Sequence, residues 1–228
     1  AAAAAAAAPP RPLLLGDTVP DFSATTTLGP MASFHEYIGH GWAVLFSHPK
    51  YNTPVCTTEL GKAALMHDEF ERRGVKVCGL SCDDVNDTKE WLADIKAVTG
   101  GDVTYPIVAD RDRSVATAYG MVHPNAADTM TVRSVFVIHD RQLKLSMTYP
   151  PSTGRNFDEI LRAIDSLQLT SRHKLATPEG WARGAPAIIV PSVSDDDARE
   201  LFPQGWHAEL PYLRWVKSGV SSPLPRDE

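Results

Sequence analysis

Cysteine is scarce in this sequence, where only Cys56, Cys78 and Cys82 occur among 228 residues. A small, odd number of cysteines excludes the disulfide framework of a small secreted domain and is typical of a reducing compartment. The spacing of Cys78 and Cys82 also differs from the Cys-x-x-Cys pattern of disulfide reductases and zinc sites. The cysteine count is still compatible with one reactive thiol.

Long apolar runs and an excess of positive charge are also missing. The longest apolar stretches, such as 42–46 and 185–190, have the length of strands, whereas a membrane-spanning helix needs about 20 apolar residues. The net charge is -6, and phosphate binding requires a positive surface. The eight histidines are scattered, without a His-x-x-x-His pair. We therefore expect no integral membrane segment, no nucleic-acid partner and no metal.

The N-terminus has a biased composition. Eight alanines precede prolines at positions 9, 10 and 12, so we interpret residues 1–13 as a low-complexity or disordered leader. The cysteine content makes a cytoplasmic location our default expectation. The unusual leader keeps a nuclear or organellar location open as the alternative.

Strand and helix signals alternate along most of the chain. Short apolar runs predict strands, and capped or amphipathic stretches predict helices. The predicted order is strand 42–46, helix 53–74, strand 75–80, helix 87–98, strand 105–109, helix 113–119, hairpin 133–138 with 143–149, and helix 156–167. This order predicts an α/β fold, with a thioredoxin-like mixed central sheet flanked by helices on both faces.

The texture of the sequence changes after about residue 169. Prolines and tryptophans are scattered there, the predicted strands are short, and one helix is predicted over 195–202. We divide the chain into a thioredoxin-like domain, 14–170, and a small C-terminal α+β domain or arm, 171–228. This tail looks too small to fold alone, so we expect it to dock on the body or on a partner subunit.

The most informative segment surrounds Cys56. A predicted strand ends, a loop with Pro49 follows, and Thr53-Pro54 marks a helix start. Cys56 then lies in the first turn of the helix, where free N–H groups and the helix dipole favour a thiolate over a thiol. Thr53 can cap the helix and reach the sulfur, and Pro49 can shield the sulfur from water. Nearby cations are limited to Lys50 and His48, so a distant arginine brought in by the fold would serve better.

These residues carry a resemblance. The pattern Pro49-x-x-x-Thr53-x-x-Cys56, followed by Thr-Thr-Glu, resembles the peroxidatic motif of the peroxiredoxins. The segments 47–49 and 54–60 are similar to the one-cysteine, peroxiredoxin six-type subfamily. The similarity extends from Leu14 to about Lys217 and includes segments 16–22, 80–84, 104–107, 153–159 and 176–178.

The resemblance implies a role for each site residue. Cys56 would attack a hydroperoxide and become a sulfenic acid. Arg133, within Thr-Val-Arg-Ser-Val-Phe, matches the arginine that contacts both the thiolate and the peroxide. Pro49 and Thr53 match the other two active-site residues. The family's supporting polar residues correspond to His48, Glu59 and Arg155.

The resemblance also implies partners. Two-cysteine relatives carry a second cysteine near the C-terminal end, whereas here none follows Cys82. The resemblance therefore implies a mechanism that needs no bound cofactor but an external thiol reductant, either glutathione together with a glutathione transferase, or a thioredoxin-type donor. The substrates would be hydrogen peroxide and organic hydroperoxides, in antioxidant defence and redox homeostasis. By resemblance, the C-terminal part reaches across a homodimer.

Several alternatives stay open at this point. Cys56 could be an inert buried residue in a non-catalytic thioredoxin-fold scaffold. The same cysteine could also serve a peroxide sensor or chaperone-like redox switch, which would consume about one equivalent of peroxide instead of many. Cys78 is best interpreted as a core residue. Cys82 lies at a predicted strand end, and a role in resolving oxidised Cys56 is the less favoured interpretation of it.

Overall fold

A computed structural model describes residues 12–122 and 130–217. The chain divides into two compact units, one up to Arg155 and the other from Asn156. The first eleven residues, and with them most of the predicted leader, lie outside the described residues. Our domain boundary near residue 170 stays a prediction. No helix within 12–122 and 130–217 is long and apolar enough to cross a membrane.

The first unit is built on a seven-stranded mixed sheet with the order β2-β1-β5-β4-β3-β6-β7. Its strands are β1 (Ala24–Thr26), β2 (Gly29–Met31), β3 (Trp42–Ser47), β4 (Val75–Ser81), β5 (Ile107–Ala109), β6 (Arg133–His139) and β7 (Gln142–Tyr149). The strands β3, β4 and β5 are parallel neighbours, whereas β6 pairs antiparallel with both β3 and β7. The predicted mixed sheet is confirmed.

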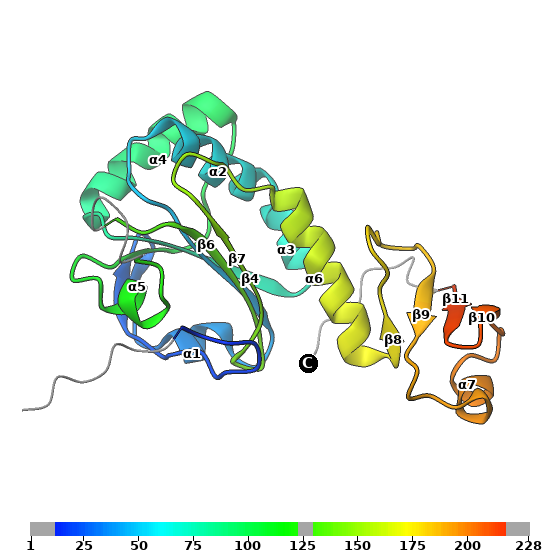
Figure 1. Cartoon of the computed structure of the whole chain (residues 1–228). Helices are drawn as coiled ribbons and strands as arrows, with labels where there is room; N and C mark the ends of the chain where they lie inside the picture. The colour runs from blue at the N-terminus through cyan, green and yellow to red at the C-terminus, as the bar shows by residue number, and fades with distance from the viewer. Residues whose placement is uncertain (1–11, 123–129, 218–228) are drawn as a thin grey trace, which may run out of the picture. The chain divides into compact units, whose positions relative to one another are not determined.

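Helices cover both faces of this sheet. They are α1 (Phe34–Ile38), α2 (Pro54–Leu65), α3 (His67–Arg72), α4 (Val85–Thr99) and α5 (Ser114–Ala118). Figure 1 shows α2 and α4 on one face of the sheet and α1 and α5 on the other. A cluster of fully buried side chains, among them Phe34, Leu45, Leu80 and Ile138, fills the space beneath α1 and α5.

The prediction of one continuous helix over 53–74 is wrong. The structure has two helices there, and Met66 separates them with φ -98° and ψ 5°, outside the helical region. The Met66 N–H still donates to the Lys62 carbonyl, which closes α2, while the Met66 carbonyl accepts from Phe70 as α3 begins. Periodicity continues across such a break, so the sequence pattern did not reveal it.

The other predicted elements are present with shifted ends. The hairpin β6–β7 turns through Asp140 and Arg141, whose positive φ values of 51° and 59° are those of a tight two-residue turn. The helix predicted from residue 87 begins two residues earlier, because the Asp84 carboxylate accepts a hydrogen bond from the Asn86 N–H.

Close packing fixes α2 against α4. A Cβ atom on Gly61 would collide with the side chain of Thr99, and one on Gly101 would meet the Gly61 carbonyl at 2.5 Å. Glycine therefore allows the middle of α2 to approach the end of α4. This contact holds the helix that carries Cys56 in a defined position on the sheet.

The second unit is a small α+β structure. Its elements are α6 (Phe157–Arg172), β8 (Leu175–Ala176), β9 (Ala187–Ile189), α7 (Asp195–Leu201), β10 (His207–Leu210) and β11 (Leu213–Val216), with the strand order β10-β11-β9-β8. Buried Leu169, Trp181, Ile189 and Phe202 belong to its core. The side chain of Asn156 caps α6 by accepting from the N–H groups of Asp158 and Glu159. The helix α6 runs five residues beyond its predicted end.

Candidate active site

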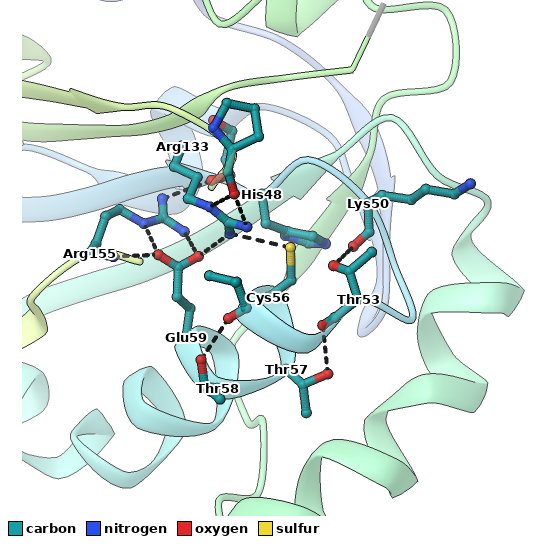
Figure 2. Close-up of polar contacts among 12 residues, drawn as sticks. His48, Lys50, Thr53, Cys56, Thr57, Thr58, Glu59, Arg133 and Arg155 are labelled. Carbon is teal, nitrogen blue, oxygen red and sulfur yellow. Dashed lines mark hydrogen bonds and ion pairs between the residues drawn. The ribbon is translucent and has the colours of Figure 1, made fainter. Parts of the chain in front are cut away.

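Cys56 lies in the first turn of α2, directly after the loop that leaves β3 (Figure 2). Thr53 at the N-cap has an extended backbone, and Pro54 occupies the first helical position, where its missing N–H costs nothing. The Cys56 side chain is fully buried and forms no disulfide. A buried sulfur at the positive end of a helix is placed to carry a negative charge.

Arg133 is the cation beside this sulfur. Its strand β6 pairs with β3, which brings the guanidinium over the start of α2. The Nη1 atom lies 3.3 Å from Cys56 Sγ and donates over 2.6 Å to Glu59 Oε2. The Nε and Nη2 atoms donate to the Pro151 carbonyl over 2.9 and 2.7 Å. With these bonds on both sides, the guanidinium has little freedom to turn away from the sulfur.

Glu59 links two arginines beneath the sulfur. It follows Cys56 by three residues on α2, and its carboxylate accepts from Arg133 and, over 2.7 to 2.9 Å, from the N–H, Nε and Nη2 of Arg155. The Nη1 atom of Arg155 donates to the carbonyls of Ser47 and Ser134. This buried network therefore ties α2 to both β3 and β6.

His48 is buried next to these charges, and both of its ring nitrogens lack a hydrogen-bond partner among the described residues. Burial, followed by the positive charges of Arg155 and Arg133, lowers the pKa of His48 to about 3. The imidazole is neutral near pH 7, so it does not supply the cation. The other local candidate, Lys50, is exposed. The arginines therefore provide the positive charge, as we expected of a distant arginine.

The structure corrects one detail for Thr53. We expected its hydroxyl to cap α2, but it makes no capping hydrogen bond and donates instead to the Lys50 carbonyl over 2.9 Å. Because the hydroxyl proton is used in this bond to the loop, the Thr53 oxygen can act only as an acceptor toward a bound ligand. Pro49 is buried in the same loop, directly after His48.

The other two cysteines lie outside this network. Cys78 is fully buried in β4, and burial raises its pKa far above the ordinary thiol value. Cys82 follows the end of β4 and is half-buried. Its pKa is raised to about 11, mainly by burial and further by the Asp110 carboxylate. Within the described part of the chain, no cluster of metal-binding side chains is present.

Sequence reasoning missed the backbone acceptors of the site. The Pro151 carbonyl holds Arg133, and the Ser47 and Ser134 carbonyls hold Arg155. No residue type marks a carbonyl as functional, so only the fold could reveal these contacts. The predicted residues His48, Thr53, Cys56, Glu59, Arg133 and Arg155 all come together around one helix start (Figure 2).

A buried cysteine at a helix start, paired with an arginine on a thioredoxin-like sheet, defines a thiol peroxidase. Comparison with known proteins agrees with this class. Residues 15–145 match the AhpC/TSA family, and residues 166–205 match the C-terminal domain of 1-Cys peroxiredoxin. The chain therefore belongs to the peroxiredoxins, and within them to the 1-Cys type.

Individual relatives support the same assignment. A 1-Cys peroxiredoxin of Dictyostelium discoideum is 50% identical over 89% of this chain and 84% of the relative. Peroxiredoxin-6 of Gallus gallus is 48% identical over 90% and 97% of the two chains. A solved mutant of the peroxiredoxin 6 of Arenicola marina superposes with a TM-score of 0.85 at 46% identity, covering 90% of this chain and 98% of that structure.

Proposed function

We propose that Cys56 is the peroxidatic cysteine of this thiol peroxidase and that Arg133 activates it. The observation that carries the proposal is the 3.3 Å contact between Arg133 Nη1 and Cys56 Sγ at the start of α2. A guanidinium stays charged at all relevant pH values and favours the thiolate, which is the nucleophile. Pro49, Thr53, His48, Glu59 and Arg155 complete the proposed site.

The buried charges support a thiolate. Arg133 and Arg155 bring two positive charges, and both form ion pairs with Glu59, at 2.6 and 2.8 Å. An uncompensated buried charge is costly. A Cys56 thiolate would place its negative charge 3.3 Å from the Arg133 guanidinium, which is the pairing that the proposed role of Arg133 requires.

The proposed reaction is a displacement at oxygen. The Cys56 thiolate attacks the hydroxyl oxygen of a hydroperoxide, the S–O bond forms, and the O–O bond breaks. The leaving oxygen departs with the electron pair and takes a proton from solvent, so that water or an alcohol is released and Cys56 becomes a sulfenic acid. Arg133 stabilises the charge on the leaving oxygen, and the Thr53 oxygen accepts a hydrogen bond from the peroxide O–H.

The reductant is proposed to be an external thiol. Neither Cys78 nor Cys82 suits resolution, because burial keeps both thiols protonated. A first thiol would displace water from the sulfenic acid to form a mixed disulfide, and a second would release Cys56 as a thiol. A similar solved structure, the yeast mitochondrial 1-Cys peroxiredoxin with a TM-score of 0.84 and 43% identity, is described with a thiol resolving mechanism via glutathione/thioredoxin systems. We propose the same donors for this chain, without a bound cofactor; a glutathione transferase that delivers glutathione would be a further partner.

We also propose a homodimer that uses the second unit. This unit has an apolar hollow of about 930 Å³ lined in part by Trp181, Trp206 and Trp215. Leu210 and Tyr212, which lie between Trp206 and Trp215 in the sequence, are large apolar side chains that are exposed to solvent. Sedimentation of the wild type and of Tyr212→Glu tests this: a dimer that the substitution weakens supports the proposal, and a monomeric wild type contradicts it.

Turnover separates the enzyme from the sensor that uses the same cysteine. With excess glutathione or a thioredoxin system, we expect many equivalents of hydrogen peroxide to be consumed per chain. Consumption that stops after about one equivalent with every donor tested would favour the sensor. The Cys56→Ser variant should consume none above background.

A further inference from the structure

Ser47, the last residue of β3, binds the backbone on both sides of Arg133. Its hydroxyl donates to the Val132 carbonyl over 2.6 Å and accepts from the Ser134 N–H over 3.1 Å. Val132 and Ser134 are the two neighbours of Arg133 in the chain. One hydroxyl on β3 therefore holds the piece of backbone from which the Arg133 side chain extends.

Arg133 is the middle residue of a tight turn. The Ser134 N–H also donates to the Val132 carbonyl over 3.1 Å, and a bond between residues i and i+2 is that of a γ-turn. The Ser47 hydroxyl contacts both ends of this turn and so ties the turn to β3. All four residues are buried, where a polar group that loses its partner is costly.

Thr131 makes a reciprocal contact between the same two segments. Its buried hydroxyl donates to the His48 carbonyl over 2.9 Å. The backbone pairing of β3 with β6 ends where Phe46 lies opposite Val135. The hydroxyls of Ser47 and Thr131 therefore continue the link between the two segments beyond the last paired residues.

The two linked segments lead to the two partners of the proposed activation. After Ser47 the chain runs through the loop to Cys56 at the start of α2, and β6 begins with Arg133. The 3.3 Å distance between Arg133 Nη1 and Cys56 Sγ consequently depends on how β3 and β6 are joined at this end. A charge-assisted contact weakens when its distance or angle changes.

We propose that Ser47 is a positioning residue that, together with Thr131, sets the Arg133 guanidinium against Cys56. The inference rests on the proposed roles of Cys56 and Arg133. The Ser47 hydroxyl is engaged with the backbone beside Arg133, so it acts on the sulfur through Arg133 and is not itself a catalytic residue.

The test compares two buried hydroxyls across a range of pH. Oxidation of the reduced full-length protein by hydrogen peroxide is followed by stopped flow for the wild type, Ser47→Ala and the control Thr26→Val. The Thr26 hydroxyl likewise donates to a carbonyl, that of Gly29, and accepts from an N–H, that of Leu28, but it lies on β1. We expect Ser47→Ala to slow oxidation about tenfold at neutral pH, and Thr26→Val to keep the wild-type profile.

The loss in Ser47→Ala should shrink as pH rises, because the thiolate then forms with less help from Arg133. The groups around the sulfur keep their charge from neutral pH upward. Arg133 and Arg155 stay charged, both are paired with Glu59, and His48, with a pKa of about 3, stays neutral. The pH profile therefore reports on the Cys56 thiolate. A wild-type rate and profile for Ser47→Ala would overturn the inference.

A double substitution separates positioning from a general role in the fold. If Ser47 acts through Arg133, Ser47→Ala should slow oxidation by less than about twofold in the Arg133→Lys background, because coupled sites are not additive. A loss as large as in the wild-type background would mean that Ser47 acts independently of Arg133 and contradicts the inference.

Further variants cover the remaining outcomes. Ser47→Thr keeps a hydroxyl and should restore most of the rate, whereas a rate as low as that of Ser47→Ala would show that the hydroxyl does not position Arg133. If Ser47→Ala does not fold, Thr131→Val replaces it: slower oxidation at neutral pH supports the inference, and a wild-type profile contradicts it. A Cys56→Ser variant that still reacts with hydrogen peroxide contradicts the proposed function itself.

Discussion

Cys56 and Cys78 are equally hidden from solvent, with 0% and 1% of their surfaces exposed. Their surroundings differ in charge. Cys56 lies at a helix start, 3.3 Å from a guanidinium, whereas Cys78 lies in the middle of β4 among apolar side chains. Burial alone keeps a thiol protonated, as the raised pKa of Cys78 shows. If Cys56 is the peroxidatic cysteine, as we propose, the difference teaches that a buried thiol becomes reactive through the charges placed next to it, and not through exposure.

The largest effect on peroxidase turnover should come from substituting one of the two cysteines, Cys56, and not the other, Cys78. Cys56→Ser should lower peroxidase turnover by at least about a thousandfold, because the nucleophile is lost. Cys78→Ala should retain turnover and lower the free energy of unfolding by about 1 kcal/mol, since it leaves a small cavity. Coupled peroxide consumption and urea unfolding measure the two effects. A Cys78→Ala variant as inactive as Cys56→Ser would break the comparison.

The next largest effect concerns the guanidinium that distinguishes the two environments. Arg133→Lys keeps a positive charge but cannot contact the sulfur, Glu59 and the Pro151 carbonyl together. We expect the rate of sulfenic acid formation to fall about a hundredfold. Arg72→Lys, in an exposed ion pair with Glu69, serves as the control and should react like the wild type. Equal rates for Arg133→Lys and the wild type would show that charge alone activates Cys56.

Stability should also depend on the charged environment. Glu59→Gln removes the negative charge between two buried arginines, and we expect it to lower the free energy of unfolding by about 3 kcal/mol or more. The matched change Glu69→Gln affects a more accessible carboxylate, which pairs with exposed Arg72 and part-buried Arg73, and should cost at most about 1 kcal/mol. Urea unfolding at neutral pH checks both. Equal losses would mean that the buried network does not stabilise the fold.

The smallest expected effect concerns Cys82, a third thiol that can be compared with Cys56 and Cys78. Its pKa is raised to about 11, so the thiol stays protonated through pH 9 and its thiolate grows only as pH approaches 11. In the Cys56→Ser background, alkylation of Cys82 by iodoacetamide should therefore still accelerate between pH 9 and pH 11. Peptide mapping follows the modified residue. A labelling rate that levels off below pH 9 would contradict the protonated state.

Local patterns predicted much of the fold but only half of the site. Apolar runs located β3 and β4, and Thr53-Pro54 located the start of α2. The break at Met66 escaped detection, because a single non-helical residue leaves the periodicity intact. Local reasoning also marked Cys56 as reactive, since its features lie within a few residues.

The distant parts of the site required either a resemblance or the fold. Arg133 is 77 residues from Cys56 in the chain, and an arginine in a strand has no local mark of function. The resemblance selected it, and the strand pairing of β3 with β6 explains its position. The hydroxyl of Thr53 was misjudged in part, because its choice between the helix N–H groups and the Lys50 carbonyl depends on the loop conformation.

The most direct test of the central claim is stopped-flow oxidation of the reduced protein by hydrogen peroxide, followed by tryptophan fluorescence, with mass spectrometry in parallel. The wild type should react far faster than a free thiol in solution and gain one oxygen atom on Cys56. The Cys56→Ser variant should show neither change. Oxidation of the wild type no faster than that of a free thiol, or oxygen found first on Cys78 or Cys82, would contradict the role of the charged environment around Cys56.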